Sequence, residues 1–195
     1  MKRLTVFCGS SSGTDDLYQK KAFKLGEILA DRKIGLVYGG ANVGLMKSVA
    51  NGSLGRGGKV TGVLPAFIKD KGIAHENLTE LILVETMHER KTKMNELSDG
   101  FIALPGGYGT LEEFFEILAW GQLGLHRKPV GLLNINGFYD SLKTLSQTMV
   151  KEGFLKEANR KMLLISDDIE DLLDQMENYI APTIDKWIIR DNNLA

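Results

Sequence analysis

Cysteine is nearly absent from this sequence, because Cys8 is the only one among 195 residues. A single thiol rules out an internal disulfide framework and is what a reducing cytosol permits. The apolar stretch at the N-terminus ends after a few residues at a Gly/Ser cluster, so it is too short for the hydrophobic region of a secretion signal. We therefore expect a cytoplasmic protein.

Long apolar runs and a surplus of one charge are absent as well. No segment approaches the roughly 20 apolar residues that a membrane span requires, so no membrane association is expected. The 24 basic and 25 acidic residues give a formal net charge of −1, which offers no basic surplus for nucleic acid. These absences favour a small polar ligand over a polymer.

Side-chain patterns for metal binding or covalent catalysis are also missing. His75, His88 and His126 are dispersed, and the sequence has neither an HExxH motif nor a Cys/His cluster. We expect no metal site. Cys8 has no evident base partner, so we interpret it as a half-buried packing residue.

Short apolar runs alternate with helical patterns along the chain, which is typical of βαβ units and of a parallel sheet buried on both faces. Strands are predicted near residues 3–8, 34–38, 59–64, 81–85, 100–104, 129–133 and 161–165. Apolar residues from Tyr18 to Leu29 recur at helical spacing, with an N-cap in the Thr14–Asp16 segment. Further helices are predicted near residues 44–55, 87–98, 109–123, 137–152 and 168–180, with a short closing helix between 182 and 195.

No linker or repeat divides the chain. We therefore predict one α/β domain over residues 1–195: a doubly wound, Rossmann-like fold with a mostly parallel sheet of about six or seven strands flanked by helices. In such sheets, ligands bind outside the carboxyl ends of the strands, where the strand order reverses. The strand-to-helix junctions are therefore the places to search for function.

The junction after the fifth predicted strand is rich in glycine. Gly106, Gly107 and Gly109 allow backbone N–H groups to approach a ligand, and the following helix adds its positive N-terminal end. The Thr110 hydroxyl can donate to a phosphate oxygen. A tight turn is the alternative interpretation, but three glycines and a threonine between strand and helix favour a phosphate cradle.

Two other junctions carry glycines, at residues 8–13 and 39–44, and we expect Ser10 and Gly40 to shape the ligand pocket. Gly39 and Gly44 have the separation of a P-loop. However, Leu45 stands where the P-loop lysine belongs, so an NTPase is disfavoured.

Charged residues follow the fourth predicted strand. Arg90 and Lys91 fall in the first turn of a helix, where positive charge opposes the helix dipole unless an anion lies nearby. The alternative is that Thr86 and Glu89 form a capping box and that Arg90 is a solvated surface cation. The capping box leaves the two cations unexplained.

Glu113 is open to two interpretations. Thr110 and Glu113 have the spacing of a capping box, which would make the glutamate structural. Beside a phosphate cradle, however, Glu112 and Glu113 repel the ligand unless they act on another part of it. A carboxylate that faces the sugar could activate water and stabilise positive charge at the anomeric carbon.

The segments MHERK (87–91) and PGGYGTLEE (105–113) closely resemble the LOG family of cytokinin riboside 5′-monophosphate phosphoribohydrolases, formerly mislabelled lysine decarboxylases. The resemblance covers nearly the whole chain. It continues through CGSS (8–11), YGGANVGLM (38–46), GVLP (62–65), HENLTEL (75–81) and KPVGLLNINGFYD (128–140). One departure is Gly72, where relatives often have a glutamate, and this could alter affinity or base preference.

The resemblance implies a homodimer that hydrolyses a nucleoside 5′-monophosphate, such as AMP or an N6-prenylated AMP, to free base and ribose 5-phosphate, without a metal or organic cofactor. It assigns catalysis to Arg90 and Glu113. It also implies that Lys91 and residues 107–112 contact the nucleotide, with the phosphate on Gly107, Gly109 and Thr110. The expected substrate-binding residues are Ser10, Gly40, Met87, Lys91, Gly106, Gly107, Tyr108, Gly109, Thr110 and Glu112.

Two other functions stay open. A non-catalytic nucleotide- or cofactor-binding carrier, such as the molybdenum-cofactor carriers that share this type of fold, is the main alternative. A lysine decarboxylase would need a pyridoxal cofactor, and no lysine is marked as a Schiff-base former. A homodimer is also favoured by the helix after the phosphate loop, which has Phe114, Phe115, Leu118 and Trp120 on more than one face.

Overall fold

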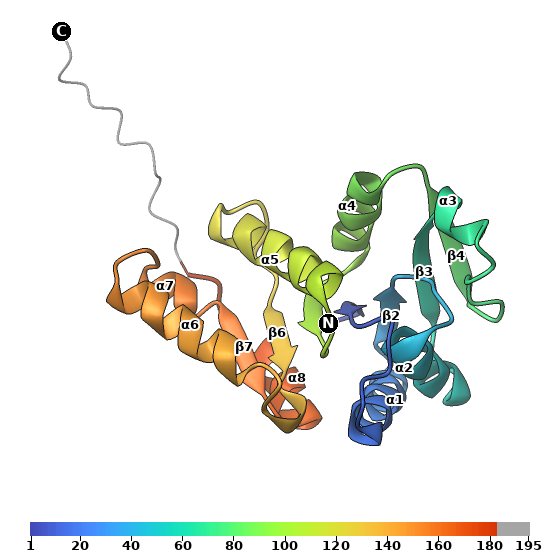
Figure 1. Ribbon diagram of the computed structural model, residues 1–195, viewed down its shortest axis with the longest axis horizontal. Coiled ribbons are helices and arrows are strands. Elements are labelled where there is room, and N and C mark those ends of the chain that lie inside the picture. The colour runs from blue at the N-terminus through green and yellow to red at the C-terminus, as the bar shows by residue number, and fades with distance from the viewer. Residues whose placement is uncertain (183–195) are drawn as a thin grey trace, which may run out of the picture.

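The computed structural model describes residues 1–182, and these form a seven-stranded sheet in which every neighbouring pair of strands is parallel (Figure 1). The strands are β1 (Arg3–Phe7), β2 (Gly35–Tyr38), β3 (Val60–Pro65), β4 (Glu80–Val84), β5 (Gly100–Ala103), β6 (Val130–Leu133) and β7 (Leu163–Ser166). All seven predicted strands are confirmed, each within two residues of its expected bounds.

The strand order is β4-β3-β2-β1-β5-β6-β7. The chain runs outward from β1 to β4, returns to the other side of β1 as β5, and then runs outward again. The strand order therefore reverses between β1 and β5, which is the switch point of the sheet. Doubly wound sheets bind their ligands in the crevice at the carboxyl ends of the two strands that flank this point. The loops after β1 and β5 are thereby brought together at the centre of the sheet.

Helices cover both faces of the sheet. They are α1 (Asp16–Asp31), α2 (Gly44–Gly55), α3 (Ala66–Lys69), α4 (Met87–Leu97), α5 (Tyr108–Gln122), the 3-10 turn η1 (Ile135–Gly137), α6 (Asp140–Lys151), α7 (Glu157–Arg160) and α8 (Ile169–Glu177). None of these helices is long and apolar enough to span a membrane. The closing helix expected between 182 and 195 falls almost entirely outside the described residues.

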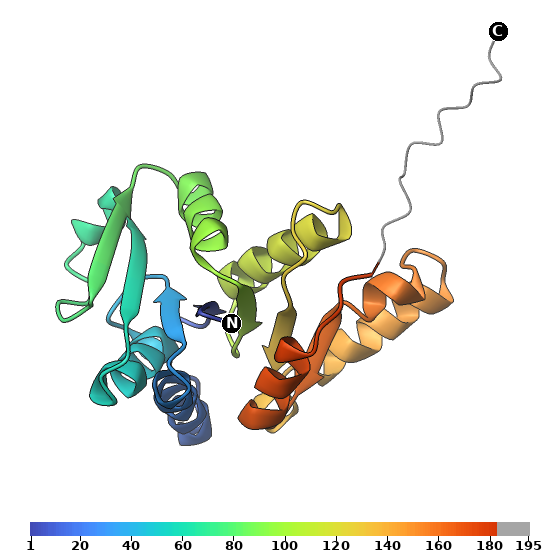
Figure 2. The same cartoon turned by 180° about the vertical axis from the view of Figure 1, so that it is seen from behind.

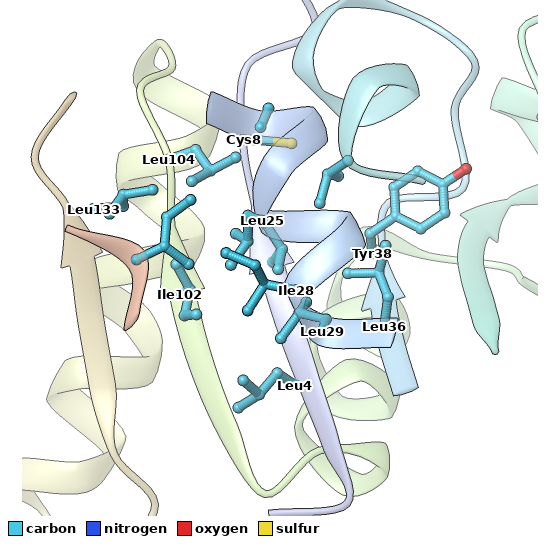
Figure 3. Close-up of a cluster of buried hydrophobic side chains, with 14 of the residues drawn as sticks. Leu4, Cys8, Leu25, Ile28, Leu29, Leu36, Tyr38, Ile102, Leu104 and Leu133 are labelled. Atoms are coloured by element: carbon cyan, nitrogen blue, oxygen red, sulfur yellow. The ribbon is translucent and has the colours of Figure 1, made fainter. Parts of the chain in front are cut away.

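Alternate residues of each strand face opposite layers, so the sheet has a core on each side. In β1, Leu4 and Val6 pack with α1, α2 and α8, and Figure 3 shows part of that cluster. Phe7 packs on the other face with residues of α4 and α5. The helices α4 and α5 lie next to each other on that face, as Figure 2 also shows from behind.

The helix expected at 137–152 is confirmed as α6 but begins three residues later, at Asp140. It follows the 3-10 turn η1, in which Asn136 has a left-handed backbone conformation with a φ of 53°. The Asn134 side chain accepts a hydrogen bond from the Tyr139 backbone N–H in that turn. The N-cap of α1 is Asp15, which accepts from the Leu17 N–H.

The helices α1 and α2 touch each other through their main chains. A Cβ atom on Gly52 would lie 2.0 Å from the Phe23 carbonyl oxygen, and one on Gly26 would lie 2.1 Å from the Val49 carbonyl oxygen. No side chain fits in this seam. The two glycines therefore set how closely α1 and α2 pack, and both helices begin beside the central loops.

We predict that Gly52→Ala lowers the free energy of unfolding by about 2 kcal/mol, because the added methyl group forces the two main chains apart. Gly55→Ala is the matched control in the same helix, since a Cβ there meets nothing within 4 Å. It should be neutral or slightly stabilising. Urea unfolding followed by circular dichroism compares them, and equal midpoints for both variants would contradict the close packing.

Candidate functional site

The loops after β1 and β5 are joined at the switch point of the sheet. The Gly9 N–H donates to the Pro105 carbonyl oxygen at 3.1 Å. A cavity of about 360 Å³ lies beside this junction. Its lining is Gly9, Ser10, Ser11, Ser12, Gly13, Tyr18, Leu45, Pro105, Gly106, Gly107 and Phe138. Three of the expected substrate-binding residues, Ser10, Gly106 and Gly107, therefore face one cavity.

The helix α5 begins at this cavity, and no side chain caps its N-terminus. Its N-cap is Gly107, so the capping-box interpretation of Thr110 and Glu113 is wrong, because the helix begins before Thr110. The first N–H groups of a helix have no acceptor within it and are free for another partner. The start of α5 is therefore an available anion site.

The three glycines of this loop have different surroundings. A Cβ on Gly106 would lie 2.1 Å from the Thr110 hydroxyl oxygen, so Gly106 permits close packing of the loop on its own helix. A Cβ on Gly107 or Gly109 would meet nothing within 4 Å. Thr110 is buried, whereas the Tyr108 side chain is 94% exposed. The open surface at the start of α5 is therefore the one along Gly107 and Gly109.

The Gly-rich loop at residues 39–44 packs against the loop after β1 and does not form a second phosphate cradle. The Leu45 N–H, at the start of α2, donates to the Gly9 carbonyl oxygen at 3.1 Å. A Cβ on Gly44 would lie 2.4 Å from Ser10 backbone atoms. Gly40, expected at the pocket, has a φ of 76°, and a Cβ there would face Leu64. The N-terminus of α2 is thus packed against protein, which a P-loop helix is not.

Arg90 is buried, so the alternative interpretation of a solvated surface cation is wrong. It is 8% exposed and begins the second turn of α4, because the helix starts at Met87. Its Nε donates to the Val63 carbonyl oxygen at 3.0 Å, and its Nη1 donates to the Glu113 carboxylate. The guanidinium therefore joins α4, β3 and α5 at the carboxyl edge of the sheet.

Glu113 lies on α5 and is buried with Arg90. Burial raises the pKa of this carboxyl above its ordinary value, and the positive charge of Arg90 opposes the rise. Burial also strongly raises the pKa of the Cys8 thiol, and the Glu113 carboxylate adds to that effect. Cys8 is buried in the core and neutral, so the packing role expected for it is confirmed, although it is more buried than expected.

Polar residues around the pair are held by partners of their own. Lys91 forms ion pairs with Glu112 and Glu116, and its side chain is 12% exposed.

The N-terminus of α4 is capped by a side chain. The Thr86 hydroxyl accepts from the Glu89 N–H at 3.1 Å, so the expected N-cap of α4 is confirmed. The Glu89 carboxylate reaches back to the N–H of Glu85, one residue earlier than a capping box places it. Met87 is 40% exposed at the start of α4.

Two aromatic residues of the cavity carry no site motif in the sequence. Tyr18 belongs to the helical spacing of apolar residues in α1, and Phe138 belongs to the longer segment at 128–140. Their rings lie 6.1 Å apart in an edge-to-face arrangement at the cavity. Phe138 precedes α6 in sequence, so no local pattern joins it to Tyr18.

Gly72 and the histidines lie outside this cavity. Gly72 is exposed, and its φ of 70° is a backbone conformation that glutamate rarely adopts. Within residues 1–182, no three His, Cys, Asp or Glu side chains are grouped so that they could hold a metal ion. His75 and His126 are buried and hydrogen-bonded to Asn51 and to the Ile117 carbonyl oxygen.

Comparisons with known proteins agree on one family. A family model described as possible lysine decarboxylase matches residues 46–176. The cytokinin riboside 5′-monophosphate phosphoribohydrolase LOG7 of Arabidopsis thaliana is 47% identical over 178 residues, which are 91% of this chain and 82% of that protein. LOG2 of the same plant, with the same description, is 45% identical over 92% of this chain and 84% of that protein.

Solved structures of the same fold include proteins that bind molybdenum cofactor. The molybdenum cofactor binding protein of Rippkaea orientalis aligns with a TM-score of 0.68 and 25% identity, over 91% of this chain and 96% of that chain. The molybdenum cofactor carrier protein of Chlamydomonas reinhardtii aligns with a TM-score of 0.67 over 90% of this chain and 96% of that chain. At 18% identity, the second shows a shared fold alone.

We predict that Arg90→Met lowers the free energy of unfolding by about 3 kcal/mol, because it leaves the Glu113 carboxylate buried without its partner. The double variant Arg90→Met/Glu113→Leu should recover most of that loss, since it removes both charges. Urea unfolding of the single and double variants measures the coupling. Additive losses in the double variant would contradict a buried pair.

Proposed function

This chain belongs to the LOG family, and on that basis we propose that it hydrolyses the N-glycosidic bond of a nucleoside 5′-monophosphate, AMP or an N6-prenylated AMP, to free base and ribose 5-phosphate. The curated relatives LOG7 and LOG2 are named as phosphoribohydrolases of cytokinin riboside monophosphates. A single domain carries the site. The observation on which the proposal depends is the buried pair of Arg90 and Glu113 beside the uncapped start of α5.

In this proposal, the phosphate binds where the loops after β1 and β5 meet. The support is the cavity of about 360 Å³, the open surface along Gly107 and Gly109, and the absence of a side-chain cap on α5. The helix dipole and backbone N–H groups favour an anion there. Ser10 at the cavity adds a hydroxyl group. Gly40 does not line this cavity, and its proposed role is limited to the turn after β2, where its φ is 76°.

Glu113 is the proposed general base. An ionised carboxylate in a buried place can accept a proton from water as the water attacks the anomeric carbon, while the bond from that carbon to the base nitrogen breaks. Its negative charge also stabilises the positive charge that develops on the sugar. Arg90 holds the carboxylate in position, and its positive charge opposes the rise of the Glu113 pKa that burial causes.

A carrier function is the second candidate, because solved proteins of this fold bind molybdenum cofactor. An anion-binding carrier needs backbone N–H groups and cations. It gains nothing from a carboxylate buried close to the anion, since like charges repel. The burial of Glu113 with Arg90 therefore favours the enzyme.

The reaction is proposed to use neither a metal nor an organic cofactor. The family description mentions lysine decarboxylase, which needs a lysine able to form a Schiff base with pyridoxal. The lysine beside the site, Lys91, instead forms ion pairs with Glu112 and Glu116. We also propose a cytoplasmic location, supported by the single, buried cysteine.

We predict that AMP or N6-prenyl-AMP yields free base and ribose 5-phosphate, and that adenosine reacts at least about 100-fold more slowly. The reason is that binding energy from the remote phosphate places the sugar beside Glu113. Chromatography of the products, in buffer with EDTA, measures both rates. Equal rates on AMP and adenosine would contradict the phosphate site, and restoration of activity only by a divalent metal would contradict the mechanism.

Glu113→Gln separates catalysis from binding in the same assay. It should lower kcat by roughly 100-fold or more, the effect of a lost acid–base group. Glu116→Gln is the matched control on the same helix, because Lys91 keeps its second partner, Glu112. Normal turnover by Glu113→Gln would exclude the carboxylate as the base.

We also propose a homodimer, formed through a surface of α5 and α6. Phe114 of α5 is buried in the core against the sheet, whereas the neighbouring Phe115 is 39% exposed. Phe115 and Leu118 line an apolar groove of about 180 Å³ with Leu145 and Met149 of α6. Exposed apolar surface of this kind is typical of an interface.

Leu145→Glu should convert the proposed dimer to a monomer, because it places a charge in the apolar groove. The matched control is Phe23→Glu on α1, on the other face of the sheet, where the side chain is 41% exposed and Leu145 is 47% exposed. Light scattering at micromolar concentration gives the mass of each. A monomeric wild-type protein would contradict the dimer, and a dimeric Leu145→Glu variant would contradict this surface.

A further inference from the structure

The guanidinium of Arg90 has one nitrogen without a protein acceptor. Nε donates to the Val63 carbonyl oxygen, and Nη1 donates to the Glu113 carboxylate. Within the described part of the chain, Nη2 donates to no acceptor. Because the other two nitrogens are held by protein, Nη2 is the donor that Arg90 can offer to a ligand.

Gly39, directly after β2, lies against this nitrogen. A Cβ atom on Gly39 would lie 2.3 Å from Arg90 Nη2 and 3.0 Å from Met46 Sδ. The neighbouring Gly40 has a φ of 76°, but Gly39 does not have a positive φ. The backbone at residue 39 therefore suits any amino acid, and the reason for a glycine there is the space that Arg90 occupies.

We infer that Gly39 is a positioning residue for Arg90: its missing side chain leaves room for the guanidinium to lie at the end of β2 with Nη2 free for the substrate. This inference rests on the proposed function, because the substrate of that reaction is the ligand to which Arg90 Nη2 would donate. Gly39, in the loop at residues 39–44, would thereby serve catalysis without forming part of the phosphate cradle.

The guanidinium cannot move aside without losing its other contacts. Cβ contacts below 3.0 Å are essentially never seen, so an alanine at residue 39 would displace Nη2 by at least 0.7 Å, the difference between 3.0 and 2.3 Å. That displacement disturbs the bonds to Val63 and Glu113, which hold the same planar group. The same Cβ position lies 3.0 Å from Met46 Sδ, so the methyl group would be crowded on that side as well.

The test is the hydrolysis of AMP by Gly39→Ala. We expect kcat to fall by about 10- to 100-fold, since a misplacement of about 1 Å at a reacting group has effects of this size. KM should stay within about threefold of the wild-type value, because the phosphate cradle is on other loops. An unchanged kcat, or a loss confined to KM, would overturn the inference.

Gly35→Ala is the matched control at the other end of β2. A Cβ there would lie 3.0 Å from Cγ of the Arg3 side chain, far from the proposed site along the strand. It should leave both kcat and KM unchanged. If Gly35→Ala lowered kcat as much as Gly39→Ala does, the loss would reflect strand damage and not the position of Arg90.

A stability cycle tests the contact without using activity. Gly39→Ala should lower the Tm of the wild-type chain by about 4 °C or more, and should lower it far less in the double variant Arg90→Ala/Glu113→Gln, which lacks the guanidinium and leaves no unpaired carboxylate. If that background does not unfold cooperatively, Arg90→Lys replaces it, because lysine has no Nη2. Equal losses in both backgrounds would overturn the inference.

The cycle also separates this inference from the proposed function. A wild-type chain that does not hydrolyse any nucleoside monophosphate would refute the proposed function, whatever Gly39→Ala does. A coupled loss of Tm in that case would leave Gly39 as a packing partner of Arg90 only. An active wild type with an equally active Gly39→Ala variant would refute the inference and leave the function intact.

Discussion

A positive and a negative side chain buried together at the carboxyl edge of the sheet determine how this site is built. Removing a guanidinium and a carboxylate from water costs several kcal/mol for each ion unless the two meet and their remaining hydrogen bonds are satisfied. Arg90 and Glu113 meet each other, and Arg90 Nε also donates to the Val63 carbonyl oxygen, so within the described residues only Nη2 of the guanidinium has no protein acceptor. The positions of α4, α5 and β3 at this edge are therefore linked by one set of contacts.

The sequence predicts the central strands well because they are buried on both faces, which produces apolar runs of four to six residues that are too short for a core helix. It predicts the two Gly-rich loops at the switch point for a related reason, since glycine between strand and helix is a local signal. The 3-10 turn before α6 was not predictable, because a left-handed asparagine leaves no pattern in the spacing of apolar residues. The short helices α3 and α7 were missed because four residues carry no periodicity.

The site was predictable in its residue types but not in its contacts. Arg90 looked like a surface cation because a helix pattern describes only local neighbours, whereas its partners are 27 and 23 residues away in sequence. Thr110 and Glu113 matched a capping box because that pattern ignores where the helix begins, and α5 begins earlier. Tyr18 and Phe138 are 120 residues apart in sequence, and only the folded chain brings their rings together.

The contact between α1 and α2 has a consequence for how this protein can vary. Where side chains pack, a larger residue can be accommodated by new rotamers around it, so such positions drift over evolutionary time. Gly26 and Gly52 face main-chain atoms, which have no rotamers to change. Substitutions elsewhere in these helices can accumulate. The contact between α1 and α2, however, has no space for a side chain at Gly26 or Gly52, so lineages that keep the fold are held to glycine at both positions.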